Sequence, residues 1–185
     1  MARLIYLTTM SLDGYVADAD GNIDFTAPDE EVLTFVNDRV RPVGTYLFGR
    51  RMYETMRYWE TADTLPEPSA AHDFERIWRG ADKIVYSSTL QAADTARTTV
   101  ERDFDPDRVL KLKSAADRDL DIGGAHLAGQ AIAAGLVDLY HLFVVPVMVG
   151  GGTQALPRQV RLNLTLEREQ RFRSGTVYLC YRPAA

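Results

Sequence analysis

Hydrophobic positions along the chain follow two alternating patterns. Short unbroken apolar runs, such as residues 4–7, are typical of strands buried on both faces, whereas apolar residues three or four positions apart, such as Val32, Val36 and Val40, are typical of helices. The runs predict strands at residues 3–10, 46–48, 83–86 and 140–148, and shorter strands are expected at residues 97–101 and 119–122. The spaced positions predict helices at residues 28–41, 49–56, 69–80, 106–116 and 125–134, with a loop over residues 65–69.

The pattern changes near the C-terminus. Residues 161–172 and 176–182 alternate apolar and polar side chains around Ser174-Gly175, which indicates a β-hairpin. Because strands and helices alternate up to this hairpin, the sequence predicts a three-layer α/β/α fold with a mostly parallel central sheet and a C-terminal antiparallel hairpin. A chain of 185 residues is expected to form one domain, residues 1–185.

Composition narrows the class of protein. Hydrophobic residues make up 46% of the chain and charged residues 25%, as in ordinary soluble domains. The net charge of −5 argues against non-specific nucleic-acid binding, which needs a basic face. The single cysteine, Cys180, cannot form an intrachain disulfide and is expected to be a buried thiol in a reducing cytoplasm. No secretion signal and no apolar run of about 18 residues is found, so no membrane partner is expected.

A Gly-Gly turn, Gly123-Gly124, joins a predicted strand to a predicted helix that begins near Ala125 and His126. Two residues without Cβ atoms let an anion approach the backbone, and the free amides and positive dipole end of the following helix favour negative charge. The turn therefore predicts a nucleotide phosphate site. A tight turn that needs glycine for steric reasons alone is the alternative interpretation.

The first strand ends in Ser11-Leu12-Asp13-Gly14, which places polar side chains at its carboxyl end. Open α/β sheets bind their ligands at that edge, so this segment predicts a binding site, with a simple turn as the alternative. The acids at Asp18, Asp20 and Asp24 lack the distal bidentate glutamate of a calcium loop, so no metal site is predicted.

Two further strand ends carry anion-binding residue types. Gly49 opens a helix whose first turn holds Arg50 and Arg51, where a bound anion would offset the unfavourable position of two cations at the positive end of a helix. Residues 87–89 place three hydroxyls after another strand, where they can donate to phosphate oxygens or form a turn.

Together these segments resemble the dihydrofolate reductase-like superfamily, and within it the C-terminal reductase domain of the bifunctional riboflavin-biosynthesis deaminase-reductase. The matching segments follow the family's order over nearly the whole chain: residues 11–14, 49–50, 85–88, 122–124, 136–139, 145–147 and 150–153. The deaminase half of that enzyme, with its zinc-binding His and Cys residues, is absent, which implies a stand-alone reductase domain.

The resemblance implies an NADPH-dependent oxidoreductase that reduces a small molecule and forms a homodimer. Asp13 is the first candidate for orienting the substrate or supplying a proton, with Ser11 beside it. The implied cofactor contacts are the nicotinamide end at Thr9 and residues 11–14, including Gly14, the phosphates at Gly49, Arg50 and Arg51, the adenosine 2′-phosphate at Ser87 and Ser88, and the pyrophosphate at Gly123, Gly124, Ala125 and His126.

The sequence leaves more than one substrate and more than one class of function open. Dihydrofolate reductases bind the pterin through an acid near the start of their first long helix, and Glu31 is the closest counterpart here. The tryptophan-containing substrate loop of those enzymes is missing between Gly14 and Pro28, so a reductase of the 5-amino-6-(5-phosphoribosylamino)uracil type is favoured over a dihydrofolate reductase. A non-catalytic nucleotide-binding regulatory or structural protein is the alternative from another class.

Overall fold

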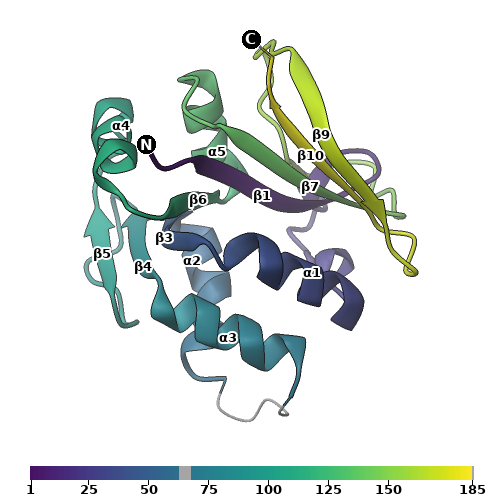
Figure 1. Cartoon of the computed structure of the whole chain (residues 1–185), viewed down its shortest axis with the longest axis horizontal. Helices are drawn as coiled ribbons and strands as arrows, with labels where there is room; N and C mark the ends of the chain where they lie inside the picture. The colour runs from purple at the N-terminus through teal and green to yellow at the C-terminus, as the bar shows by residue number, and fades with distance from the viewer. Residues whose placement is uncertain (63–67, 185) are drawn as a thin grey trace.

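An eight-stranded sheet runs through the chain in the computed structural model, which describes residues 1–62 and 68–184 (Figure 1). Its strand order is β5-β4-β3-β6-β1-β7-β10-β9, in which the first six strands are parallel and β10 and β9 are antiparallel. The strands are β1 (Leu4–Ser11), β3 (Val43–Gly49), β4 (Asp82–Tyr86), β5 (Thr98–Glu101), β6 (Asp119–Gly123), β7 (Leu139–Val145), β9 (Leu164–Arg171) and β10 (Val177–Pro183). The mostly parallel sheet with a C-terminal antiparallel hairpin is confirmed.

Helices cover both faces of this sheet (Figure 1). On one face lie α1 (Glu30–Val40), α2 (Arg50–Met56) and α3 (Ala70–Gly80), and on the other lie α4 (Pro106–Ala115) and α5 (Ala125–Ala133). Successive side chains of β1 point to opposite faces of the sheet and are buried under both helix layers. Ile5 packs into the core under α1 and α3, whereas Leu4 and Tyr6 pack into the core under α4 and α5. The helices and strands thus form the three layers that the sequence predicts.

The start of α1 differs slightly from the predicted start at Pro28. The Asp29 side chain accepts a hydrogen bond from the Val32 N–H at 2.8 Å, so this residue caps the helix and Glu30 is its first residue. The Glu30 carboxylate accepts a hydrogen bond from the Ala70 N–H at 2.7 Å, at the start of α3. Of the loop predicted over residues 65–69, residues 65–67 lie outside the described part of the chain.

A second, two-stranded sheet forms in part from the segment between β1 and α1, for which the sequence predicts neither a strand nor a helix. It pairs β2 (Tyr15–Ala17) with β8 (Thr153–Gln154), and a short 3-10 helix, η1 (Asp24–Thr26), follows before α1. The pairing joins segments far apart in the sequence, so no local pattern predicts it. Strand β7 ends at Val145 rather than 148, since Pro146 has no N–H to donate.

No helix in the described ranges has both the length and the apolar character needed to cross a membrane.

Candidate functional site

The predicted site residues gather at one edge of the sheet, where four neighbouring parallel strands end. In the order β4-β3-β6-β1, the residues at or just beyond these ends are Ser87, Gly49, Gly123 and Ser11. Phe48 pairs with Gly123 and Gly49 pairs with Tyr86, so the ends of β3, β4 and β6 are level with one another. The fold thereby brings together groups from four distant parts of the sequence.

Both residues of the Gly123-Gly124 turn favour glycine, Gly123 for lack of space and Gly124 for its backbone conformation. A Cβ atom at Gly123 would lie 2.8 Å from two carbons of the Phe48 ring, and Gly124 has a positive φ of +93°. A Cβ atom on Gly124 would also lie 3.8 Å from the backbone nitrogen of Gly49. The two predicted strand-glycine-helix junctions are therefore direct neighbours, and α5 begins at Ala125 immediately after the turn.

Arg50, in the first turn of α2, reaches across to the segment after β4. Its Nη1 atom donates to Thr89 Oγ1 at 2.7 Å, and its Nε atom donates to Glu54 at 2.7 Å. Ser87 is buried, and its Oγ accepts the Leu90 N–H at 3.0 Å, so it holds the turn that presents exposed Ser88 and Thr89. Arg50, which is ion-paired with Glu54, and the hydroxyl segment after β4 thus form one hydrogen-bonding corner.

The other two charged or ring-bearing candidates face solvent. Arg51 is exposed in the first turn of α2. His126 is exposed in the first turn of α5, where its Nδ1 lies 3.4 Å from Gln130 Nε2. Each side chain lies beside a glycine junction and is open to solvent, so each could reach a phosphorylated ligand there. Their contacts with such a ligand stay predictions.

Ser11 and Asp13 build the turn after β1. The buried Ser11 hydroxyl donates to Asp13 Oδ1 at 2.6 Å and accepts the Tyr15 N–H at 2.9 Å. The Ser11 hydroxyl and the N–H groups of Gly150 and Val149 hold the pKa of Asp13 below its ordinary value. At neutral pH Asp13 is therefore an ionised hydrogen-bond acceptor, which suits orientation of a ligand better than supply of a proton.

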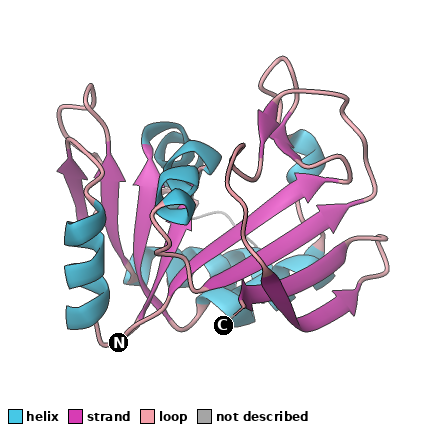
Figure 2. Cartoon of the chain, turned by 90° about the horizontal axis from the view of Figure 1, so that it is seen from above, coloured by secondary structure: helices cyan, strands magenta, loops and turns pink. Residues whose placement is uncertain are grey.

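Neighbouring strands β1 and β6 part before they reach this edge. They pair only at Leu4 with Leu120 and at Ile5 with Asp121, whereas β1 pairs with β7 from Ile5 to Ser11. Figure 2 shows the strands fanning apart as they cross the molecule. We call the unpaired stretch between β1 and β6 beyond Ile5 and Asp121 the β1/β6 seam. Thr9 lies on one side of it and the Gly123-Gly124 turn on the other.

A cavity of about 100 Å³ lies beside Thr9, at the carboxyl ends of β1 and β7 and the start of α1. Four hydroxyls and one carboxylate give it a polar lining among apolar groups. The lining residues are Thr9, Thr26, Ala27, Pro28, Asp29, Val32, Val145, Ser174 and Thr176.

The acid that lines this cavity is Asp29 rather than Glu31, which was predicted as the substrate ligand. The Glu31 carboxylate accepts the Arg173 N–H at 3.2 Å at the exposed turn between β9 and β10. The local sequence pattern has no signal that would place Asp29 beside β1, nor one that would place Thr26, Ser174 and Thr176 there. Only the packing of the hairpin turn against the start of α1 brings them there.

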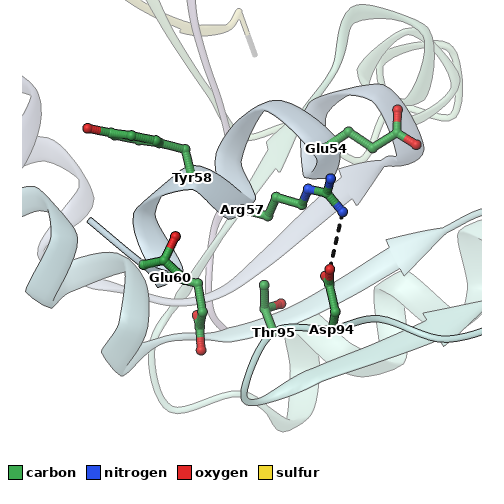
Figure 3. Close-up of a pocket in the computed structure, with 7 residues that line it drawn as sticks. Glu54, Arg57, Tyr58, Glu60, Asp94 and Thr95 are labelled. Atoms are coloured by element: carbon green, nitrogen blue, oxygen red, sulfur yellow. Dashed lines mark hydrogen bonds and ion pairs between the residues drawn. The ribbon is translucent and has the colours of Figure 1, made fainter. Parts of the chain in front are cut away.

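A larger cavity of about 270 Å³ includes none of the predicted residues in its lining, although Glu54 at its edge is the ion-pair partner of Arg50 (Figure 3). Its lining combines three carboxylates with one guanidinium, and Arg57 Nη1 lies 3.2 Å from Asp94 Oδ2. The lining residues are Glu54, Arg57, Tyr58, Glu60, Thr61, Asp94 and Thr95. Because acids predominate in this lining, the cavity does not suit a phosphorylated ligand.

Residues 1–62 and 68–184 contain no group of three or more His, Cys, Asp or Glu side chains that could hold a metal ion.

Comparison with known proteins adds to this geometry. Residues 2–178 match the family model described as the RibD C-terminal domain. The uncharacterized protein YyaP of Bacillus subtilis (strain 168) is 26% identical over 183 residues, which cover 97% of this chain and 94% of YyaP. A putative riboflavin biosynthesis protein from Shewanella sp. PV-4 has a similar structure, with a TM-score of 0.77 and 17% identity over 100% of both chains.

A more distant structure settles the fold class. Dihydrofolate reductase from Enterococcus faecalis, complexed with NADP(H) and RAB-propyl, has a TM-score of 0.63 at 14% identity, over 99% of this chain and 97% of that one. Likeness at such identity shows the fold alone. The dihydrofolate reductase-like fold that the sequence predicts is therefore confirmed.

Proposed function

This chain belongs to the RibD C-terminal domain family and is an oxidoreductase, and we propose that it transfers a hydride from NADPH to a small heterocyclic substrate. The substrate type we favour is that of a 5-amino-6-(5-phosphoribosylamino)uracil reductase. The observation that carries the proposal is that the two glycine junctions, at Gly49 and at Gly123-Gly124, are neighbours on the carboxyl edge of the parallel sheet.

The glycine junctions fit the phosphates of a dinucleotide. Because a Cβ atom at Gly123 would overlap the Phe48 ring, this part of the backbone stays bare, and bare backbone is what a pyrophosphate needs for close approach. The first amides of α5 follow directly, at Ala125 and His126, and add donors and a favourable dipole. The neighbour complexed with NADP(H) supports the choice of a nicotinamide cofactor.

The corner formed by Arg50, Ser88 and Thr89 supports NADPH over NADH. The two dinucleotides differ by the 2′-phosphate, which a guanidinium and hydroxyls recognise through charge-assisted hydrogen bonds. The Arg50 guanidinium already lies at hydrogen-bond distance from Thr89, so it is held at the position where a phosphate would meet both groups.

The substrate end is the cavity beside Thr9. When bound, NADPH supplies the hydride, and the protein orients and shields the acceptor. Asp29 uses Oδ1 to cap α1, so its second oxygen can accept an N–H of a heterocycle. The Thr176 hydroxyl accepts from Ser174 at 3.0 Å and keeps its own proton to donate. These groups match a ring that carries both N–H donors and carbonyl acceptors.

Titration of the purified protein with NADPH and NADH, followed by tryptophan fluorescence, tests the cofactor. Gly124→Asp places a carboxylate in the turn, and Gly21→Asp is the matched control because Gly21 also has a positive φ, +85°, with open space around it. We expect NADPH to bind more tightly than NADH and Gly124→Asp alone to abolish binding. Absence of NADPH binding to the unmodified protein at about 1 mM, which corresponds to roughly −4 kcal/mol, would refute the proposal.

Turnover separates an enzyme from a non-catalytic nucleotide-binding protein. The decrease of NADPH absorbance would be followed with a panel of pyrimidinones, with and without a ribosyl phosphate, and with dihydrofolate. We expect oxidation of NADPH with a pyrimidinone. Tight NADPH binding with no oxidation by any compound of the panel would favour the regulatory or structural alternative.

We also propose that the protein is a homodimer that buries the outer surface of β9. The side chains of β9 are largely exposed, and Leu164 and Leu166 are 37% and 44% exposed. Light scattering after size-exclusion chromatography should give twice the chain mass, and Leu166→Lys should shift it to the monomer. A monomeric mass for the unmodified protein would contradict this arrangement.

A further inference from the structure

Asp121 is a buried acid in the middle of the sheet. It is 5% exposed and lies on β6, where it pairs with Ile5 of β1 on one side and with Tyr46 of β3 on the other. The pair between Ile5 and Asp121 is the last one before the β1/β6 seam. Asp121 therefore stands at the point where the two strands part.

The Asp121 carboxyl faces the first amide of β1 that the main chain of β6 leaves unpaired. In a parallel ladder, alternate residues of a strand direct their N–H groups to the same neighbour, so Leu7 is the next residue of β1 after Ile5 to face β6. Against the larger opposing effect of burial, the Leu7 N–H lowers the pKa of Asp121, so this amide faces the Asp121 carboxyl. Beyond Ile5 the Leu7 amide thus has the Asp121 side chain before it rather than a paired residue of β6, while β1 continues along β7 to Ser11.

The second oxygen of Asp121 has no hydrogen-bond partner among the described residues. The Tyr46 hydroxyl also has no hydrogen-bond partner among these residues. Tyr46 of β3 is paired with Asp121, so the two side chains lie on the same face of the sheet. Burial raises the pKa of Asp121 to about 8, so the carboxyl is mostly neutral at pH 7. An unpartnered buried polar atom costs about 1–3 kcal/mol, so an apolar residue would suit a purely structural position better.

We propose that Asp121 is a positioning residue for the cofactor: its carboxyl holds β1 apart from β6 at Leu7, which keeps the seam open between Thr9 and the Gly123-Gly124 turn. This inference rests on the proposed function, because the seam is taken to receive the nicotinamide end of NADPH. The geometry explains how a glycine turn and a polar strand edge can face each other across adjacent strands without pairing.

An apolar side chain at position 121 should close the seam. Without the carboxyl, the Leu7 N–H loses its acceptor, and the β6 main chain offers replacement carbonyls. We therefore expect β1 to move toward β6 in Asp121→Val and to extend the ladder past Ile5. Asp121→Asn keeps an oxygen that accepts the Leu7 N–H and should leave the seam unchanged.

Three variants test the inference: Asp121→Val, Asp121→Asn and the control Tyr46→Phe, which removes the other unpartnered oxygen but not the acceptor for Leu7. For Asp121→Val we expect the NADPH Kd and the KM for NADPH to rise about tenfold or more, with thermal stability equal to or above that of the unmodified protein. Asp121→Asn and Tyr46→Phe should remain within about twofold in both constants. An unchanged NADPH Kd in Asp121→Val would overturn the inference.

A crystal structure of Asp121→Val without nucleotide separates this inference from the proposed function. Pairing of β1 with β6 beyond Ile5 supports the role of Asp121 in the seam even if NADPH does not bind the unmodified protein. Pairing that still stops at Ile5 refutes that role whatever the protein binds. If Asp121→Val does not fold, Asp121→Ala, which also lacks the acceptor but adds no bulk, serves for the same measurements with the same two outcomes.

Discussion

Asp13 accepts a hydrogen bond from the Gly150 N–H at 2.7 Å and joins the turn after β1 to the glycine loop after β7. A second N–H, that of Val149, lies 3.2 Å from the same carboxylate. Two segments that the sequence keeps far apart, residues 11–14 and 150–153, are thereby fixed at the edge of the candidate site. The acid that the sequence suggests for chemistry thus has a defined task in holding this edge together.

Replacing Asp13 should loosen the loop at residues 149–150 rather than remove a proton donor. In Asp13→Ala the amides of Val149 and Gly150 lose their acceptor, so we expect their hydrogen exchange to accelerate and substrate KM to rise. Asp13→Asn retains one acceptor oxygen and should show a smaller change. Because the pKa of Asp13 is already below its ordinary value, the pH profile of turnover between pH 6 and 8 should keep its shape in Asp13→Asn. A lost limb of that profile would instead identify Asp13 as the proton donor.

Arg50 should set the preference for NADPH. Arg50→Met removes the cation beside Thr89 but keeps a side chain that forms helix well, so NADPH affinity should fall about tenfold while NADH affinity stays within about twofold. The matched control is Arg108→Met, because Arg108 is also an exposed helical arginine paired with an acid, Glu101, at 2.8 Å. Equal losses for both dinucleotides would mean that Arg50 contacts a phosphate common to them.

Lys113 should be a strong determinant of stability. Its ammonium is buried in α4 and donates to the Leu136 carbonyl at 2.8 Å, and it lies 2.7 Å from Asp138 Oδ2. Lys113→Met leaves both acceptors without this donor, so we expect the free energy of unfolding to fall by about 2–4 kcal/mol in urea denaturation. Lys111→Met, at an exposed position of the same helix, should change it by less than about 0.5 kcal/mol. Equal effects of the two would show that the buried contacts contribute little.

His141 should make the fold sensitive to acid. Its Nδ1 lies 2.5 Å from the Tyr178 hydroxyl, and burial lowers its pKa to about 4. The folded state therefore keeps His141 neutral where the unfolded chain binds a proton, so its contribution is complete above pH 6.5 and is lost as the pH falls toward 4. Urea denaturation should show a loss of at most about 1.4 kcal/mol per pH unit from this group, and His141→Gln should reduce the slope. An unchanged slope in His141→Gln would assign the acid sensitivity to other groups.

Much of the fold follows from local pattern. The apolar run of β1 predicts its strand because a strand covered on both faces needs apolar side chains at successive positions. The spacing of Val32, Val36 and Val40 predicts α1 because a helix that covers a sheet needs apolar side chains on one face. The β2–β8 pair does not follow from pattern, since each strand is two or three residues long and depends on a partner far away in the chain. The glycine junctions can also be predicted from local sequence, because a positive φ or a backbone without a Cβ atom favours glycine.

What the sequence by itself determined is which groups end each strand: Ser11 and Asp13 after β1, Gly49 and Arg50 after β3, and the Gly123-Gly124 turn after β6. Only the tertiary structure decided which of these ends are neighbours and which further groups join them. Asp29 rather than Glu31 lines the cavity beside Thr9 because the start of α1 packs against the turn between β9 and β10. Strand order and register arise from contacts between distant segments, so Asp121, whose carboxyl meets Leu7 only where β1 leaves β6, acquires its significance from the folded sheet alone.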